Sequence, residues 1–153
     1  MQIKVKIIRD LEIIEKELNS ISTGVLAIPF EENFEQIAAN FVYHNKNIFV
    51  FLQNKEQYRN IKFGSTAKFT AIKDVGRKGK AADDKNTVYN LFYVSVNGII
   101  KKVEEKKLKN TIKQSFIQKY SGRLIETDSK PKSLGKLLFI DSEELFATEE
   151  IGS

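Results

Sequence analysis

The sequence has no cysteine and no tryptophan, and it has one histidine and two prolines among its 153 residues. The absence of cysteine excludes disulfides, thiolate nucleophiles and cysteine-ligated zinc or iron–sulfur sites. No stretch approaches the ~20 apolar residues that a helix needs to span a bilayer. Residues 1–9 alternate lysine with isoleucine and valine, so they lack the apolar run of a signal peptide and instead suggest a short strand or extended arm. We therefore expect a cytoplasmic protein without membrane contact.

The composition is that of one soluble globular domain. The chain is 41% hydrophobic and 29% charged, and its length suits a single domain, residues 1–153. The net charge of +5 favours anionic partners. The lysines are spread along the chain, as on an ordinary solvated surface. A nucleic-acid-binding barrel is therefore an alternative but not the expected function.

Hydrophobic periodicity predicts two amphipathic helices. The first covers about residues 10–20, with Asp10 as its N-cap, and the second covers residues 104–120. Their apolar stripes are Leu11, Ile14, Leu18 and Ile21 in the first, and Leu108, Ile112, Phe116, Ile117 and Tyr120 in the second. Such spacing places each stripe on one helix face. A third, short helix is predicted at residues 55–63.

The remaining apolar segments predict strands. Their ranges are 23–30, 36–43, 48–52, 66–73, 88–103 and 137–140. Polar loops are predicted at residues 74–87 and 121–136, and the acidic tail from Asp141 is expected to end in a helical turn. The strand phenylalanines expected mainly in the core are Phe41, Phe49, Phe51, Phe69 and Phe92.

The order of these elements predicts a mainly β fold. Most strands follow one another through hairpins or short links, such as the turn at residues 44–47, which favours an antiparallel sheet. Gly98 lies inside the long strand and predicts a bulge of the kind that barrel corners need. We expect an antiparallel sheet curled into a barrel with helices over its ends. A doubly wound parallel sheet would need regular strand–helix alternation.

Four segments, in this order, resemble the FMN-binding split barrels of the pyridoxamine 5'-phosphate oxidase-like superfamily. They are GVLAIP (24–29), NFVYHNKNIFVFLQ (40–53), RNIKFGSTAKFTAI (59–72) and YVSVNGIIKKVEEKKLK (93–109). The resemblance implies a split β-barrel that pairs as a homodimer, with FMN in the groove between the subunits. It also implies an FMN-dependent, oxidoreductase-like activity, without identifying the substrate.

The resemblance also implies which residues hold the cofactor. The strand at 36–43 would edge the flavin ring, the strand at 48–52 and the helix after it would hold the phosphate, and the late strand of the partner would touch the ring. The residues carried over are Gln36, Ala39, Asn40, Phe41, Phe51, Leu52, Gln53, Lys55, Gln57 and Tyr93. No catalytic side chain and no metal site is implied.

The phosphate-holding segment departs from the family pattern. Glu56 and Gln57 occupy positions that are usually basic, and Lys55 and Arg59 are the nearest cationic residues. A phosphate prefers charged donors, because charge-assisted hydrogen bonds are roughly twice as strong as neutral ones. The departure leaves open a split barrel without flavin that acts as a non-catalytic binding module, or a haem-handling protein of the same fold.

Other chemical candidates are weaker. His44 is expected to be solvated in its turn, since one ligand cannot make the usual three- or four-ligand metal site. Glu31, Glu32 and Glu35 are expected to be solvated as well. The segment GRKGK (76–80) is not a phosphate loop, because no serine or threonine follows its last lysine.

Overall fold

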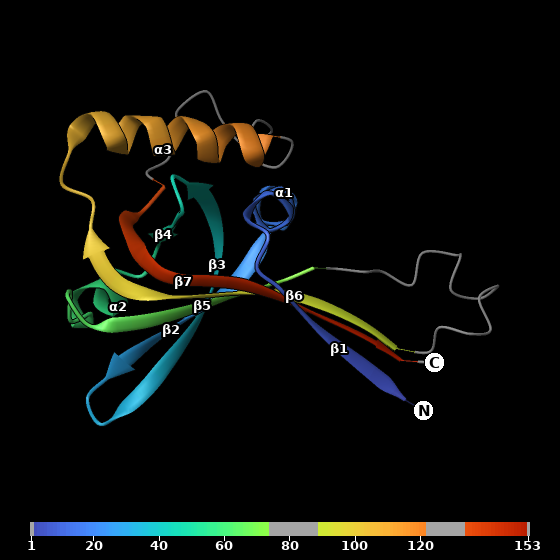
Figure 1. Ribbon diagram of the computed structural model, residues 1–153. Helices are drawn as coiled ribbons and strands as arrows, with labels where there is room; N and C mark the ends of the chain where they lie inside the picture. Colours follow the sequence, from blue (N-terminus) through green and yellow to red (C-terminus); the bar gives the residue numbers. More distant parts are fainter. Residues whose placement is uncertain (1, 74–88, 122–133, 153) are drawn as a thin grey trace.

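The computed structural model describes residues 2–73, 89–121 and 134–152. Figure 1 shows the arrangement of the helices and strands. In chain order they are β1 (Ile3–Ile8), α1 (Leu11–Ser20), β2 (Thr23–Phe30), β3 (Asn33–His44), β4 (Asn47–Leu52), α2 (Lys55–Asn60), β5 (Thr66–Ile72), β6 (Tyr89–Lys102), α3 (Lys106–Lys119) and β7 (Lys136–Gly152). The loop expected at residues 74–87 and most of the one at 121–136 lie outside the described residues.

The strands form an antiparallel barrel. Their order is β1-β7-β4-β3-β2-β5-β6, and β6 pairs back onto β7, which closes the sheet into a ring. Every pairing is antiparallel. Closure removes the free edges that an open sheet would expose. The predicted antiparallel barrel is confirmed.

The acidic tail is not helical, so that prediction is wrong. Residues 141–152 continue β7, which is 17 residues long. This half of β7 lies between β6 and β1, and the three strands form an arm that projects from the barrel (Figure 1). Opposite charges favour the pairing: Glu149 lies across from Lys6 in β1, and opposite-charge pairs stabilise neighbouring strands. The 137–140 strand therefore extends to the end of the described chain.

The barrel interior is filled by alternate strand residues. Phe41 and Phe69 meet there edge-on, with ring centroids 4.9 Å apart. Helix α1 adds Ile14 and Leu18, both fully buried, to the same cluster. Its N-cap is confirmed, because the Glu12 N–H donates to the Asp10 carboxylate at 3.0 Å. Of the strand phenylalanines, Phe41, Phe49, Phe69 and Phe92 are buried as expected, whereas Phe51 is half-buried.

A second apolar cluster lies outside the barrel, beneath α3. Ile112 and Phe116 of α3 pack there against Val42 and Phe49. Ile117, predicted for the buried stripe, is exposed. The cluster fixes α3 across β3, β4 and the start of β7 (Figure 1).

The long strand β6 bends at Gly98, as predicted. The pairing with β7 shifts between Asn97 and Gly98. A β-carbon on Gly98 would lie 2.1 Å from the Asp141 carbonyl oxygen, so the close approach of these two backbones requires glycine. Bulges of this kind let a sheet curve into a barrel.

Two residues at the end of α3 hold β3 where it separates from β2. The pairing of β2 with β3 ends at Thr23 and Asn40. The next residue, Phe41, donates its N–H to the Tyr120 hydroxyl at 3.0 Å. That hydroxyl lies 2.6 Å from the Ser22 carbonyl and 2.8 Å from the Phe41 carbonyl. Lys119 Nζ also donates to the Phe41 carbonyl, at 3.1 Å. On the side of Phe41 that faces away from β4, these side chains thus take the place of β2.

The remaining differences from the expected boundaries are small. Strand β3 begins at Asn33 rather than Gln36, because the turn before it consists of Glu31 and Glu32 alone. Helix α2 ends at Asn60. None of the helices among the described residues is both long and apolar enough to cross a membrane.

Candidate flavin-binding face and α2 corner

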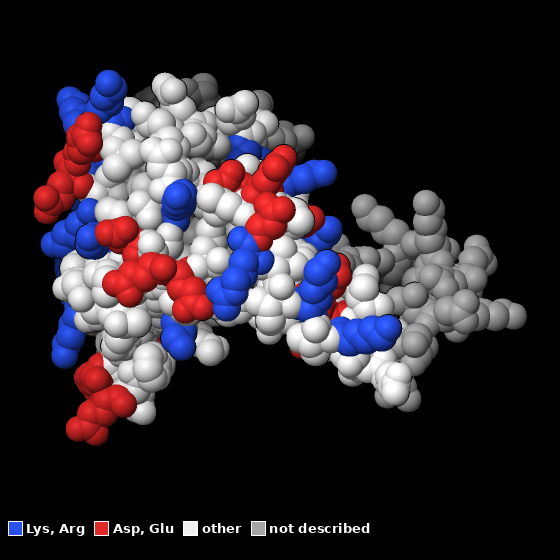
Figure 2. Space-filling view, in the orientation of Figure 1, with Lys and Arg blue, Asp and Glu red and all other residues white. Residues whose placement is uncertain are grey.

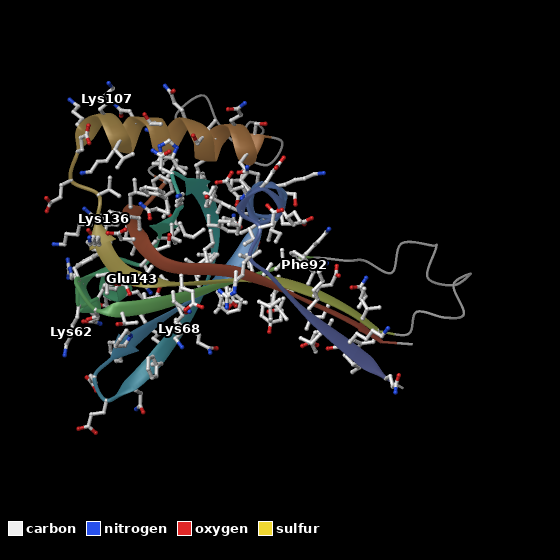
Figure 3. All side chains as sticks on the ribbon, in the orientation of Figure 1. Lys62, Lys68, Phe92, Lys107, Lys136 and Glu143 are labelled. Carbon is white, nitrogen blue, oxygen red and sulfur yellow. The ribbon has the colours of Figure 1, made fainter. Side chains whose placement is uncertain are left out.

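One side of the barrel wall is not covered by a helix. We call the outward side of β3, β2, β5 and β6 the outer face. Two cross-strand rows line it: Gln36, Ala27, Lys68 and Asn97 form one, and Ala38, Val25, Thr70 and Ser95 form the other. Figure 3 shows Lys68 on the side of the sheet away from α3. The second row has short side chains only, so it makes a level surface on which a planar group could lie.

The outer face continues onto the arm as an apolar surface. Ile3, Val5 and Ile7 point to this side from β1, and their side chains are 48%, 60% and 49% exposed. Ile7 lies across from Thr148, which lies across from Tyr93 on β6. Ile72 of β5 lies beside Tyr93 and is 53% exposed. Exposed apolar side chains of β1 and β5 thus lie on the same side of the sheet as the outer face.

The structure divides the ten residues implied by the resemblance into three groups and one outlier. On the outer face lie Gln36, Asn40 and Tyr93; in the barrel interior lie the side chains of Ala39, Phe41 and Leu52; around α2 lie Gln53, Lys55 and Gln57. The outlier is Phe51, whose ring packs edge-on against Phe116 of α3 at 5.0 Å. The three interior residues can reach a ligand only through their main chains.

The outer-face group does not converge within one chain. Gln36 and Asn40 belong to β3, whereas Tyr93 belongs to β6, and β2 and β5 lie between them. Three strand spacings amount to ~14 Å. These residues could line one ligand only if a second copy of the chain met the first across the outer face.

The α2 corner, formed by Gln53–Asn60 and the facing Glu35, is held together by its own hydrogen bonds. Asn54 caps the helix: its side-chain oxygen accepts from the N–H groups of Glu56 at 2.9 Å and Gln57 at 3.2 Å. These are the main-chain donors that a helix start would otherwise offer to an anion. The helix has only six residues.

The side-chain amides at the corner are also engaged. Gln57 Nε2 donates to the Glu35 carboxylate at 3.2 Å, so Glu35 is half-buried and paired, and its predicted solvation is wrong. Gln53 Nε2 donates to the Leu134 carbonyl. The next residue, Gly135, lies so close to β4 that a β-carbon would be 2.4 Å from the Leu52 carbonyl oxygen. The residues just before β7 therefore contact this side of the corner.

These residues do not fit a phosphate group. The capping oxygen of Asn54 occupies the helix donors, and the carboxylates of Glu35 and Glu56 offset the charges of Lys55 and Arg59. A dianion needs charged or unpaired donors to offset its desolvation. The α2 corner therefore does not provide an anchor for a cofactor phosphate.

His44 and the acidic turn show no metal chemistry. His44 ends β3, and its ring lies edge-on to Phe49 with centroids 6.1 Å apart. Glu31 and Glu32 are exposed, as expected. No three of the described histidine, aspartate and glutamate side chains gather where they could hold a metal ion. Charges of both signs are interspersed on the face that Figure 2 shows.

Sequence reasoning missed the groups that organise this region. The Asn54 cap could have been found, because an asparagine before a short helical segment is a recognised start signal. The Gln57–Glu35 hydrogen bond joins residues 22 positions apart, and the Lys119–Phe41 hydrogen bond joins residues 78 positions apart. No local sequence pattern predicts either contact.

Comparison with solved structures identifies the fold. No family model matches the sequence, and a sequence comparison with the curated proteins finds no match. An FAD-binding protein from Mesorhizobium loti is similar in structure, with a TM-score of 0.66, 12% identity, and coverage of 97% of this chain and 99% of that one. The haem storage protein HutZ of Vibrio cholerae has a TM-score of 0.63, 15% identity and coverages of 89% and 92%.

A third similar structure is a Corynebacterium glutamicum protein named for pyridoxamine 5'-phosphate oxidase. Its TM-score is 0.62 at 16% identity, over 95% of this chain and 98% of that one. Together with the antiparallel ring of strands and its flanking helices, these similarities show that the chain has the fold of the pyridoxamine 5'-phosphate oxidase-like split barrels.

Proposed function

We propose that this chain is a cytoplasmic homodimer that binds a flavin between two copies of its outer face and acts as an oxidoreductase. The observation that carries the proposal is the uncovered outer face, where a row of short side chains runs into the exposed apolar surface of the arm. Proteins of this fold bind flavin nucleotides or haem, according to the names of the similar structures.

The chemistry of the outer face suits a flavin ring. The short residues Ala38, Val25 and Thr70 leave room for a planar group. Gln36 can supply an amide donor and acceptor at its edge, and Asn40 an amide donor, since the Asn40 oxygen accepts from the Thr23 hydroxyl at 3.1 Å. Tyr93 of the partner subunit can supply an aromatic contact. A bound flavin would supply the redox chemistry, and the protein would position it and set its electrostatic environment.

The absorption spectrum of the purified protein tests the cofactor, together with the mass of any ligand released on unfolding. We expect the purified protein to show a flavin spectrum. If it is purified without ligand, we expect added riboflavin or FMN to bind and to raise its melting temperature. If neither flavin binds or stabilises the protein, the proposed function is wrong.

A substitution in the row of short side chains tests whether the flavin binds at the outer face. Ala38→Arg would put a long charged side chain in the middle of the outer face, and we expect it to abolish flavin binding while the circular dichroism spectrum is kept. Asn19→Arg, on the exposed side of α1, is the control and should bind flavin like the unmodified protein.

A second candidate function is a split barrel without flavin that binds another partner through the same face. The hydrogen bonds within the α2 corner favour this candidate, because they already use the donors that a cofactor phosphate would need. A stable dimer that binds no flavin would support this candidate. A haem function gains no comparable support, since His44 packs against Phe49.

A further inference from the structure

We infer that this protein recognises a flavin through its ring and sugar-alcohol chain alone, so that a terminal phosphate adds no affinity. The inference rests on the proposed flavin site and specifies the ligand class: unphosphorylated riboflavin binds as well as FMN. Three features of the α2 corner carry it.

The first feature is the capped helix start. The N–H groups of Glu56 and Gln57 both donate to Asn54 Oδ1, at 2.9 and 3.2 Å. A phosphate could use these donors only by displacing the Asn54 side chain. The exchange replaces two hydrogen bonds with two others and leaves the asparagine oxygen unpaired, so the net gain is small.

The second feature is the charge distribution. Glu56 carries its carboxylate in the first turn of α2, and Gln57 holds the carboxylate of Glu35 beside it at 3.2 Å. Both carboxylates would repel a phosphate dianion, and their repulsion offsets the attraction of Lys55 and Arg59. A hydroxyl group carries no charge and can donate to a carboxylate, so the terminal hydroxyl of riboflavin meets no such penalty.

The third feature is the contact between the corner and the residues just before β7. Gln53 points its amide to the Leu134 carbonyl, and Gly135 lies against the Leu52 carbonyl with no room for a β-carbon. One amide hydrogen of Gln53 is therefore already used within the protein, and a phosphate would have to compete with the Leu134 carbonyl for it.

The direct test compares dissociation constants of the full-length protein for riboflavin and FMN, measured by quenching of flavin fluorescence. We expect the two constants to agree within about threefold. FMN binding more than about tenfold tighter than riboflavin would overturn the inference while leaving the proposed function intact.

An NMR titration with inorganic phosphate tests the corner independently of any flavin. We expect the amide signals of Glu56 and Gln57 to stay in place, because their hydrogens are held by Asn54. Saturable shifts of these two signals at millimolar phosphate would overturn the inference. If no flavin binds and the signals stay in place, the proposed function fails while the account of the corner stands.

A charge reversal tests whether affinity for the phosphate can be gained. Glu56→Lys should tighten FMN binding at least threefold relative to riboflavin, because it removes the repelling carboxylate and adds a cation. Glu12→Lys makes the same charge change on the exposed start of α1 and should leave the ratio unchanged. An equal gain in both variants would mean that net charge, not the corner, governs phosphate binding.

Discussion

At the scale of single residues, the hydroxyl of Tyr120 holds β3 in place through hydrogen bonds with main-chain atoms. It accepts from the Phe41 N–H and lies in hydrogen-bonding distance of the Ser22 and Phe41 carbonyls. Tyr120→Phe leaves the buried N–H without this partner, and an unsatisfied buried group costs about 1–3 kcal/mol. We expect the free energy of unfolding to fall by that amount in urea titrations.

Tyr58→Phe is the matched control for this substitution. Tyr58 is half-buried against Phe63, and its hydroxyl has no hydrogen bond among the contacts of the described residues. We expect a loss below about 0.5 kcal/mol, as for substitutions away from such networks. Equal losses in the two variants would contradict the role of the Tyr120 hydroxyl.

Lys119 makes the stability of the fold depend on pH. Its ammonium group donates to the Leu18 and Phe41 carbonyls at 3.2 and 3.1 Å and lies 3.8 Å from the centre of the Phe41 ring. Burial nevertheless lowers the pKa of Lys119 from 10.5 to about 8. Between these values the unfolded chain holds a proton that the folded chain has lost, so stability rises with pH in this window.

We therefore expect the free energy of unfolding to rise from pH 8 to 9.5 and Lys119→Met to remove the rise. The upper limit avoids the range where tyrosines interfere, because the pKa of Tyr43 is raised by burial and by its hydrogen bond to Glu15. A tyrosine with a raised pKa loses its stabilising contribution above about pH 10. An unchanged rise in Lys119→Met would assign it to another group.

At the scale of elements, the bulge between β6 and β7 depends on a missing side chain. A β-carbon at Gly98 would meet the Asp141 carbonyl at 2.1 Å and an Ile140 methyl at 2.8 Å. Gly98→Ala should destabilise the protein by about 1–3 kcal/mol, the usual range for overpacking. Ser95→Ala, on the outward side of the same strand, should change stability by less than about 0.5 kcal/mol. A neutral Gly98→Ala would show that the two strands can separate at little cost.

The same scale shows how far the sequence predicts the fold. Local periodicity was sufficient for α1 and β2, because each buries one face at its own spacing. For β4 the continuous apolar run was sufficient, because this strand packs on both faces. It failed for residues 141–152, because this strand forms by pairing with β6 and with β1, at the other end of the chain, where Lys6 lies opposite Glu149. The alternation in β3 does separate the outward Gln36, Ala38 and Asn40 from the buried Ile37 and Ala39. The hydrogen bond between Gln57 and Glu35 could not be predicted, since it joins α2 to β3 across 22 positions of the sequence.

At the scale of the whole molecule, the exposed apolar residues of the arm should bind a second copy. Ile7 is 49% exposed in the single chain and lies across from the uncharged Thr148, so Ile7→Lys should leave the protomer folded. In a dimer it would bury a charge against apolar residues, which is unfavourable without a partner. We expect at least a tenfold weaker dimer by analytical ultracentrifugation.

Ile13→Lys is the control for the arm. Ile13 is 44% exposed on α1, away from the outer face, and its substitution should leave the dimer unchanged. Wild-type protein that sediments only at its own mass of 17.5 kDa would contradict the homodimer at once.

The position of β7 also determines when the molecule can fold. It follows the other described strands in the sequence, and it pairs with β1, with β4 and with β6. A nascent chain that lacks residues 136–152 therefore cannot close the ring, and β1 has no neighbour. Contacts between distant parts of a sequence slow folding. Unpaired strand edges in the incomplete chain make it prone to aggregation. The barrel can therefore close only after β7 has been synthesised.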